Sequence, residues 1–254
     1  MAVDKKFTSF FLFFKGPLHT GIYGLDLAET DIIVHSDTLF SALVWGCYYL
    51  GGDELVNEFL ELYRKEACIT STLPFIATNG DSIYYLPKPR LPLHMLLDTS
   101  RIPRDYIKKI KAVEFIPLSI FEKMCSGDEI SIGDIENVYT AYKELRKYIS
   151  VSTRPRIMLD RMTNSTMLFH VDFVNFSRGS GLYFLVRGSS KFIELVRESL
   201  SFLQDHGIGG ERTYGYGFFS MDMGEVSIRY PENAEYSILL SLYYPSNEDR
   251  EKMK

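Results

Sequence analysis

The feature that most constrains this chain is a glycine-rich segment near its C-terminal end, residues 206–217. Five glycines fall within the eleven residues from Gly207 to Gly217, and the segment contains no proline. It follows an apolar, periodic stretch (192–202) that predicts a helix, and it precedes residues 218–221, which predict a strand. Since glycine tolerates positive φ angles and close contacts, the segment predicts a tightly shaped loop between helix and strand.

A loop of this composition can turn several backbone N–H groups toward one point and bind an anion, above all a phosphate. Arg212, Tyr214 and Tyr216 add a planar cation and two aromatic faces. Glycine, arginine and aromatic residues together suit a nucleic-acid backbone with unpaired bases. The same composition also fits a helix stop followed by a bulged hairpin, so a purely structural loop stays open at this point.

Two other nucleotide-binding loops do not fit the segment. A dinucleotide fingerprint follows a strand and opens a helix, whereas this loop closes a helix, and Arg212 stands where the third glycine is needed. The chain also lacks the Gly-Lys-Ser/Thr of a phosphate-binding P-loop.

Length and composition indicate a globular protein. With 254 residues, 46% of them hydrophobic, the chain can bury one large core or two small ones. No run of about eighteen apolar residues is present, and the apolar run 10–14 is too short for a signal peptide, so we expect a cytoplasmic protein without a membrane segment. The three cysteines have no metal-ligand spacing, which predicts reduced thiols, no metal site and no cofactor.

Charge is segregated along the chain, although the net charge is only −5. Residues 88–111 carry +5 and residues 141–191 carry +6, which leaves −16 for the rest. This distribution fits a basic side that faces RNA on an otherwise acidic body, but solvated charged faces would give the same pattern.

A helix start is predicted near residue 36. Ser36, Asp37 and Thr38 are good N-cap residues, and apolar residues then recur at helical spacing. The N-terminus of a helix can bind phosphate, whereas plain capping by Ser36 or Asp37 is the structural alternative. The neighbouring His35 is an RNA contact, a structural hydrogen-bonding residue or an acid–base catalyst. The sequence shows no second acid–base residue at a recognisable position to support catalysis.

The remaining chain predicts alternating strands and helices. An Asn-Gly turn at 79–80 predicts a hairpin, and the proline-rich segment 87–92 predicts an extended linker that carries the cation Lys88. Arginines flank a proline at Arg154 and Arg156, and Arg161 either contacts RNA or pairs with Asp160.

The expected strands are 7–14, 69–76, 82–86, 167–176, 181–187, 218–223 and 235–244, with 167–176 and 181–187 forming a hairpin. One expected helix begins near residue 36, and the others span 53–65, 135–148 and 191–202.

Three motifs carry a family resemblance. Residues 207–217 resemble the C-terminal glycine-rich loop of the RAMP superfamily of CRISPR proteins. Residues 35–43 (His-Ser-Asp-Thr-Leu-Phe-Ser-Ala-Leu) resemble the first helix start of one branch, the fourth subunit of the type III-A Csm effector complex, and 154–164 resemble that branch's central motif. The three motifs occur in the order that the family shows, so the resemblance covers most of the chain.

The resemblance implies an α+β fold with two ferredoxin-like (RRM-like) βαββαβ units, a thumb-like insertion and the glycine-rich loop. The corresponding division is 1–97 for the first unit, 98–152 for the thumb-like insertion, and 153–254 for the second unit with the loop.

It also implies a noncatalytic RNA-binding subunit that holds the 5′ repeat-derived handle of a crRNA. The implied protein partners are a large polymerase-like signalling subunit and an adjacent backbone subunit. The alternatives are a metal-independent endoribonuclease that uses His35 or Tyr214, and an interaction protein without an RNA role. The residues predicted to bind RNA are His35, Ser36, Asp37, Thr38, Lys88, Arg154, Arg156, Arg161, Gly207, Gly209, Gly210, Arg212, Tyr214, Gly215 and Tyr216.

Overall fold

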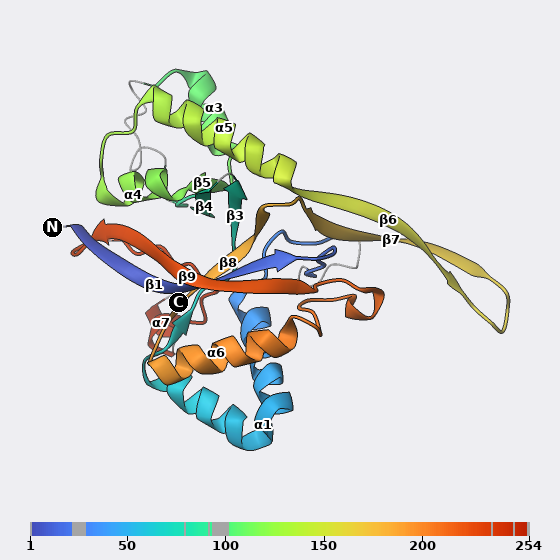
Figure 1. The fold of residues 1–254 in the computed structure, drawn as a ribbon. Helices are drawn as coiled ribbons and strands as arrows, with labels where there is room; N and C mark the ends of the chain where they lie inside the picture. Colours follow the sequence, from blue (N-terminus) through green and yellow to red (C-terminus); the bar gives the residue numbers. More distant parts are fainter. Residues whose placement is uncertain are drawn as a thin grey trace.

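One antiparallel sheet with helices on both faces forms the body of the protein (Figure 1). The computed structural model describes residues 2–21, 29–78, 80–90, 92, 102–234, 236–245 and 247–252. The strands are β1 (Ala2–Phe14), β2 (Cys68–Ile69), β3 (Leu73–Thr78), β4 (Asp81–Pro87), β5 (Phe115–Pro117), β6 (Ile149–Leu159), β7 (Thr166–Phe176), β8 (Ser180–Arg187) and β9 (Phe219–Pro231).

The seven-stranded sheet has the order β5-β4-β3-β8-β1-β9, with β2 also paired to β8. Strands β6 and β7 form a separate two-stranded arm that projects from the body (Figure 1). The helices are α1 (Ser36–Glu66), α3 (Arg104–Lys111), α4 (Leu118–Ser126), α5 (Ile132–Tyr148), α6 (Ser190–Leu203), the 3₁₀-helix η1 (Arg212–Tyr214) and α7 (Asn247–Lys252).

Side chains that alternate along the central strands supply two hydrophobic cores. In β1, Phe10 and Leu12 join the core beneath α1 and α6, whereas Phe11 and Phe13 join the opposite core beneath α4 and α5. Figure 1 shows α1 and α6 on one side of the sheet and α3, α4 and α5 on the other. The nearly continuous apolar run 7–14 is thus explained, since a strand covered on both faces needs apolar residues at successive positions.

Several predicted elements are confirmed. β3 pairs with β4 across the Asn-Gly turn, and the helix predicted at 135–148 is α5. The helices predicted from residue 36 and over 53–65 are joined in α1, with a kink at Gly51 and Gly52 where the backbone is not helical.

The strands of the two predicted units are joined in one sheet. β1, from the first unit, pairs along its whole length with β9 and over residues 8–12 with β8, and both of these strands belong to the second unit. The two units therefore do not each close a sheet of their own. Pairing between distant strands depends on which faces become buried, and no local signal in the sequence encodes that partnership.

The predicted hairpin of 167–176 with 181–187 is wrong. β7 pairs with β6, while β8 crosses to pair with β1 and β3. The short turn 177–180 misled the prediction, because it redirects the chain between sheets and does not return it along the same ladder.

The closing strand predicted at 235–244 is also wrong, because the described residues 236–245 contain no strand. β9 is instead longer than the predicted 218–223 and pairs with all of β1. Residues 239–242 run beside the start of α1, where Ser71 N–H donates to the Leu240 carbonyl (2.8 Å) and Leu242 N–H to Ser36 Oγ (3.0 Å).

Two negative findings apply to the described part of the chain. None of its helices is long and apolar enough to cross a membrane. None of its His, Cys, Asp and Glu residues gather in a group of three or more that could hold a metal.

The contact between α1 and α6 gives a stability prediction. A Cβ on Gly46 would lie 2.1 Å from Ser199 Oγ, which donates to the Leu43 carbonyl. We expect Gly46→Ala to lower the free energy of unfolding by about 1–3 kcal/mol through overpacking. Urea unfolding measures this, with Gly133→Ala in α5 as the matched control.

Gly133 has no such contact, because a Cβ added there would lie 3.7 Å from Ser131 Oγ, which is an ordinary van der Waals distance. Gly133→Ala should therefore raise stability by about 0.5–1 kcal/mol through helix propensity. A stabilising effect of both substitutions would contradict the close helix contact.

Candidate nucleic-acid interface

The glycine-rich loop and the start of α1 form the two walls of one groove. Its volume is about 270 Å³. The residues that line it are Thr20, Gly21, His35, Thr38, Ser41, Ala42, Trp45, Gly207, Ile208, Gly209, Gly210 and Arg212. Six residues predicted to bind RNA, from segments about 170 positions apart in the sequence, are thus brought together.

The helix wall is one face of α1. Thr38, Ser41, Ala42 and Trp45 are spaced three to four residues apart, so they line up along the helix and all face the groove. Sequence reasoning missed Ser41 and Trp45, although this spacing, and the fact that Trp45 is the only tryptophan of the chain, were available signals.

Arg212 and Trp45, which both line the groove, contact each other. The Arg212 guanidinium lies 5.0 Å from the centre of the Trp45 ring, which is a cation–π contact. Trp45 also contacts His206 and Tyr49, and Phe202 stacks on His206 with their ring centres 3.8 Å apart. Aromatic and cationic surfaces therefore lie side by side in the groove lining.

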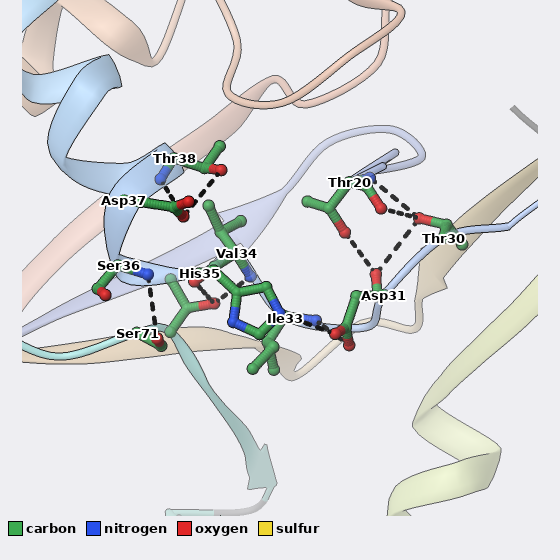
Figure 2. A network of polar contacts seen from close by, with 11 residues as sticks. Thr20, Thr30, Asp31, Ile33, Val34, His35, Ser36, Asp37, Thr38 and Ser71 are labelled. Atoms are coloured by element: carbon green, nitrogen blue, oxygen red, sulfur yellow. Dashed lines mark hydrogen bonds and ion pairs between the residues drawn. The ribbon is translucent and has the colours of Figure 1, made fainter. Parts of the chain in front are cut away.

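The start of α1 is held by neighbouring hydroxyl groups (Figure 2). The N-cap residue is His35, and no side chain caps the helix, so the predicted capping by Ser36 or Asp37 is wrong. Ser36 N–H donates to Ser71 Oγ (3.0 Å), and Asp37 Oδ1 accepts from Thr38 N–H (2.6 Å).

His35 is paired with Asp31. His35 Nε2 lies 3.0 Å from Asp31 Oδ2, and both side chains are about one-third exposed (Figure 2). The hydrogen bond to Asp31 raises the pKa of His35 above its usual value. The pKa of Asp31 is lowered: burial opposes this, but the hydrogen bond and the charge of His35 outweigh it. The pairing favours a cationic imidazole at the groove.

The groove is suited to an anion. Arg212 and His35 line it, and no carboxylate is among its described lining residues. Asp37 lies in the first turn of α1, yet it is exposed and its carboxylate is engaged by Thr38.

The glycines of the loop are packed against the connection that follows β1. Gly210 N–H donates to the His19 carbonyl (2.8 Å) and Gly217 N–H to the Pro17 carbonyl (2.7 Å). His19 Nδ1 in turn contacts the Asp172 carbonyl of β7 (2.7 Å). The loop is therefore fixed to both the sheet and the arm.

Only part of the loop backbone is left for a ligand. The N–H groups of Gly207 and Ile208 are also bonded within the protein, to Leu203 and Gly217 carbonyls. The N–H groups of Gly209, Glu211, Arg212 and Thr213 make no hydrogen bond to another described residue. An anion held by backbone would thus meet fewer donors than the glycine content predicts.

A second cluster joins the loop to the arm. Arg156 forms an ion pair with Glu211 and lies 4.3 Å from the centre of the Tyr214 ring and 5.6 Å from that of Tyr216. Arg154 lies 5.3 Å from the centre of the Phe173 ring. Tyr214 is 68% exposed, whereas Tyr216 is buried.

The other predicted residues lie apart from the groove. Arg161 is exposed in the turn of the arm, where Asp160 accepts from Met162 N–H and no ion pair with Arg161 forms within the described chain. Lys88 donates to the carbonyls of Ile110 and Lys111 (2.7 and 3.1 Å), which fixes it at the end of α3. Gly215 faces open space.

A comparison with family models decides the family. The model described as the RAMP superfamily matches residues 14–220. The chain belongs to the RAMP superfamily. The matched range begins at the last residue of β1 and contains the groove and the whole glycine-rich loop, so the resemblance inferred from the sequence is confirmed.

Two relatives within this superfamily bear the name CRISPR system Cms protein Csm4. The protein from Thermococcus onnurineus is 29% identical over 221 residues, which cover 84% of this chain and 71% of the relative. The protein from Methanocaldococcus jannaschii is 24% identical and covers 88% and 70%.

Two solved structures share the RAMP fold of this chain. A chain in the crystal structure of a Csm1-Csm4 cassette in complex with cA4 aligns with a TM-score of 0.68 at 24% identity, covering 93% of this chain and 76% of that one. A chain in the Csm3-Csm4 subcomplex of the type III-A CRISPR-Cas interference complex aligns with a TM-score of 0.54 at 21% identity, covering 86% and 69%.

The His35–Asp31 pair predicts a pH dependence of stability. The raised pKa of His35 means that its contribution is complete below pH 6.5 and is lost as pH rises through the folded-state pKa. The lowered pKa of Asp31 means that its contribution is present above pH 3.8 and lost as pH falls. We expect a double-mutant cycle of Asp31→Asn and His35→Asn, measured by urea unfolding, to give a larger coupling at pH 5.5 than at pH 8.5. Equal coupling would contradict the ion pair.

The loop glycines provide a matched pair of substitutions. Gly209 and Gly215 have φ angles of +88° and +85°, so an added Cβ strains both by about 1–2 kcal/mol. At Gly209 the Cβ would also lie 2.5 Å from the His19 carbonyl oxygen, whereas at Gly215 it meets nothing within 4 Å. We expect Gly209→Ala to lose more unfolding free energy than Gly215→Ala. Equal losses would mean that the loop is not packed on His19.

Proposed function

We propose that this chain is a noncatalytic, cytoplasmic RNA-binding subunit of a type III-A CRISPR Csm effector complex. It holds the 5′ repeat-derived handle of the crRNA and joins the large polymerase-like subunit to the adjacent backbone subunit. The observation that carries this proposal is the groove between α1 and the glycine-rich loop, with Arg212 stacked on Trp45. The Csm4 relatives support the complex, and the related Csm1-Csm4 and Csm3-Csm4 structures support both protein partners.

The groove fits unpaired RNA in three ways. Arg212 and the cationic form of His35 attract phosphate, and unbonded N–H groups of the loop lie beside them. Trp45 and Arg212 offer flat surfaces on which a base stacks. A volume of about 270 Å³ accommodates a single nucleotide more readily than a duplex.

The arrangement of the fold refines the earlier division of the chain. We propose that β1-α1-β3-β8-α6-β9 is one ferredoxin-like βαββαβ unit, since these elements give the contiguous strand order β3-β8-β1-β9. Everything between β3 and β8 is then an insertion. The helices α3, α4 and α5 lie within the residues 98–152 proposed as the thumb-like part, and the β6–β7 arm follows them.

The remaining predicted contacts extend the proposed RNA path beyond the groove. Arg154, Arg156 and Tyr214 continue from the loop toward the arm, Tyr216 is buried beside Arg156, and Arg161 lies in the arm's turn. Because Arg156 is engaged by Glu211, we assign it to positioning Tyr214 and keep Tyr214, with its exposed ring, as the base-stacking member.

The binding test is Arg212→Ala, with RNA that carries the handle and the purified chain. We expect roughly 10- to 150-fold weaker binding, equivalent to the loss of about 1.5–3 kcal/mol, and a salt slope smaller by about one. Arg197→Ala is the matched control, because Arg197 is an exposed arginine on α6 that pairs with Glu194.

Loss of binding in the control but not in Arg212→Ala would contradict the assignment. The noncatalytic role is tested on the same preparation, by incubating repeat RNA in EDTA. Handle-length products that His35→Ala abolishes would favour the endoribonuclease alternative instead.

A further inference from the structure

Strand β9 has one edge that pairs with no described strand. Among the described strands it is the last of the sheet and pairs with β1 alone, over thirteen consecutive residue pairs. Figure 1 shows β9 beside β1. In an antiparallel ladder, the N–H and C=O groups of successive residues point alternately to the two sides of a strand. Every second residue of β9 therefore directs its backbone groups to the outer edge.

The two ends of this edge are closed by side chains. Met221 N–H donates to Gln204 Oε1 (2.9 Å), and Arg229 N–H donates to Glu122 Oε1 (2.8 Å). These bonds show which residues point outward. Met223, Glu225 and Ser227 lie an even number of positions from Met221 and Arg229, so their N–H groups also point outward. No described residue bonds to these three N–H groups.

The middle of the edge is also accessible from both faces of the sheet. Phe219 is buried beneath the α1–α6 layer at one end of β9, and Val226 and Ile228 are buried in the opposite core near the other end. Between them, Asp222, Met223 and Glu225 are exposed. A long exposed edge of this kind is a template for another strand.

We propose that the outer edge of β9 pairs with an extended strand of a protein partner in the effector complex, an inference that rests on the proposed function. Backbone groups of Met223, Glu225 and Ser227 supply the hydrogen bonds of this added strand. Gly224, between Met223 and Glu225, has no side chain that could obstruct the added strand. Asp222, which forms no ion pair with a described residue, calls for a lysine or arginine on the partner strand.

Charge argues against a second copy of the chain as the occupant. If two β9 edges paired antiparallel and the pairing were centred on Met223, Glu225 and Ser227, Glu225 would lie directly opposite Glu225 of the other copy. Like charges at opposed positions destabilise a strand pair. Glu225 pairs with Lys6 (3.3 Å) within its own chain, but both side chains are exposed, so this weak surface ion pair offsets the repulsion only in part.

Residue-resolved amide hydrogen exchange tests the proposal, comparing the isolated chain with the complex assembled from both protein partners and crRNA. In the isolated chain, Met223, Glu225 and Ser227 should exchange faster than Asp222, Gly224 and Val226, whose N–H groups face β1. Assembly should slow the first three by tenfold or more and leave the second three unchanged. Unchanged exchange at the first three would overturn the proposal, and slowing that appears on concentrating the isolated chain would overturn the choice of partner.

A proline substitution supplies a second measurement. Glu225→Pro removes only an outward N–H, so the ladder with β1 is kept, whereas Glu225→Ala keeps the N–H and is the control. We expect Glu225→Pro to weaken assembly by roughly tenfold relative to Glu225→Ala. Equal assembly would overturn the proposal; if Glu225→Pro does not fold, the exchange data decide.

The readouts separate this inference from the proposed function. If the chain binds handle RNA through Arg212 and assembles while the β9 edge stays unprotected, only the inference fails. If the chain neither binds the RNA nor assembles with the partners, the proposed function fails and the inference fails with it.

Discussion

The pairing of β1 with β9 is the constraint on which the site depends. The register places Phe14, the last residue of β1, opposite Phe219, the first residue of β9. The chain that leaves β1 and the chain that enters β9 must therefore run side by side. These two segments are the connection 15–20 and the glycine-rich loop, and the Gly210–His19 and Gly217–Pro17 hydrogen bonds fix one on the other.

The start of α1 reaches the same place through β3, which is separated from β1 by β8 in the same sheet. Val34 N–H donates to Thr72 Oγ1 (2.7 Å) and Thr72 N–H to the Val34 carbonyl (2.9 Å), which ties the residues before α1 to the entry of β3. α1 then packs across the sheet on α6, with Gly46 against Ser199. One sheet thus brings the glycine-rich loop and the start of α1 together. Binding sites are commonly built in this way, from loops and element ends that a rigid scaffold positions.

The structure leaves fewer backbone N–H groups of the loop available to a ligand than its composition indicates. Glycine content predicts a cradle of backbone N–H groups, yet the N–H groups of four of the five loop glycines, Gly207, Gly210, Gly215 and Gly217, are bonded inside the protein. Close packing on His19 and on Ile208 is what excludes side chains at Gly209 and Gly217. The cations and rings of Arg212, Trp45 and Tyr214 consequently carry more of the proposed recognition, because they remain directed toward open space or the groove.

The sequence alone determined the local elements and the family. The apolar run of β1, the Asn-Gly turn, the helix start at Ser36 and the glycine-rich loop follow from residue preferences over a few positions, and three ordered motifs identified the superfamily. Tertiary structure decided the rest: that β8 pairs with β1, that β7 pairs with β6, and that Trp45 lies under Arg212. Such contacts join residues far apart in the chain, and they are chosen by which surfaces are buried together, a property that no short segment of sequence contains.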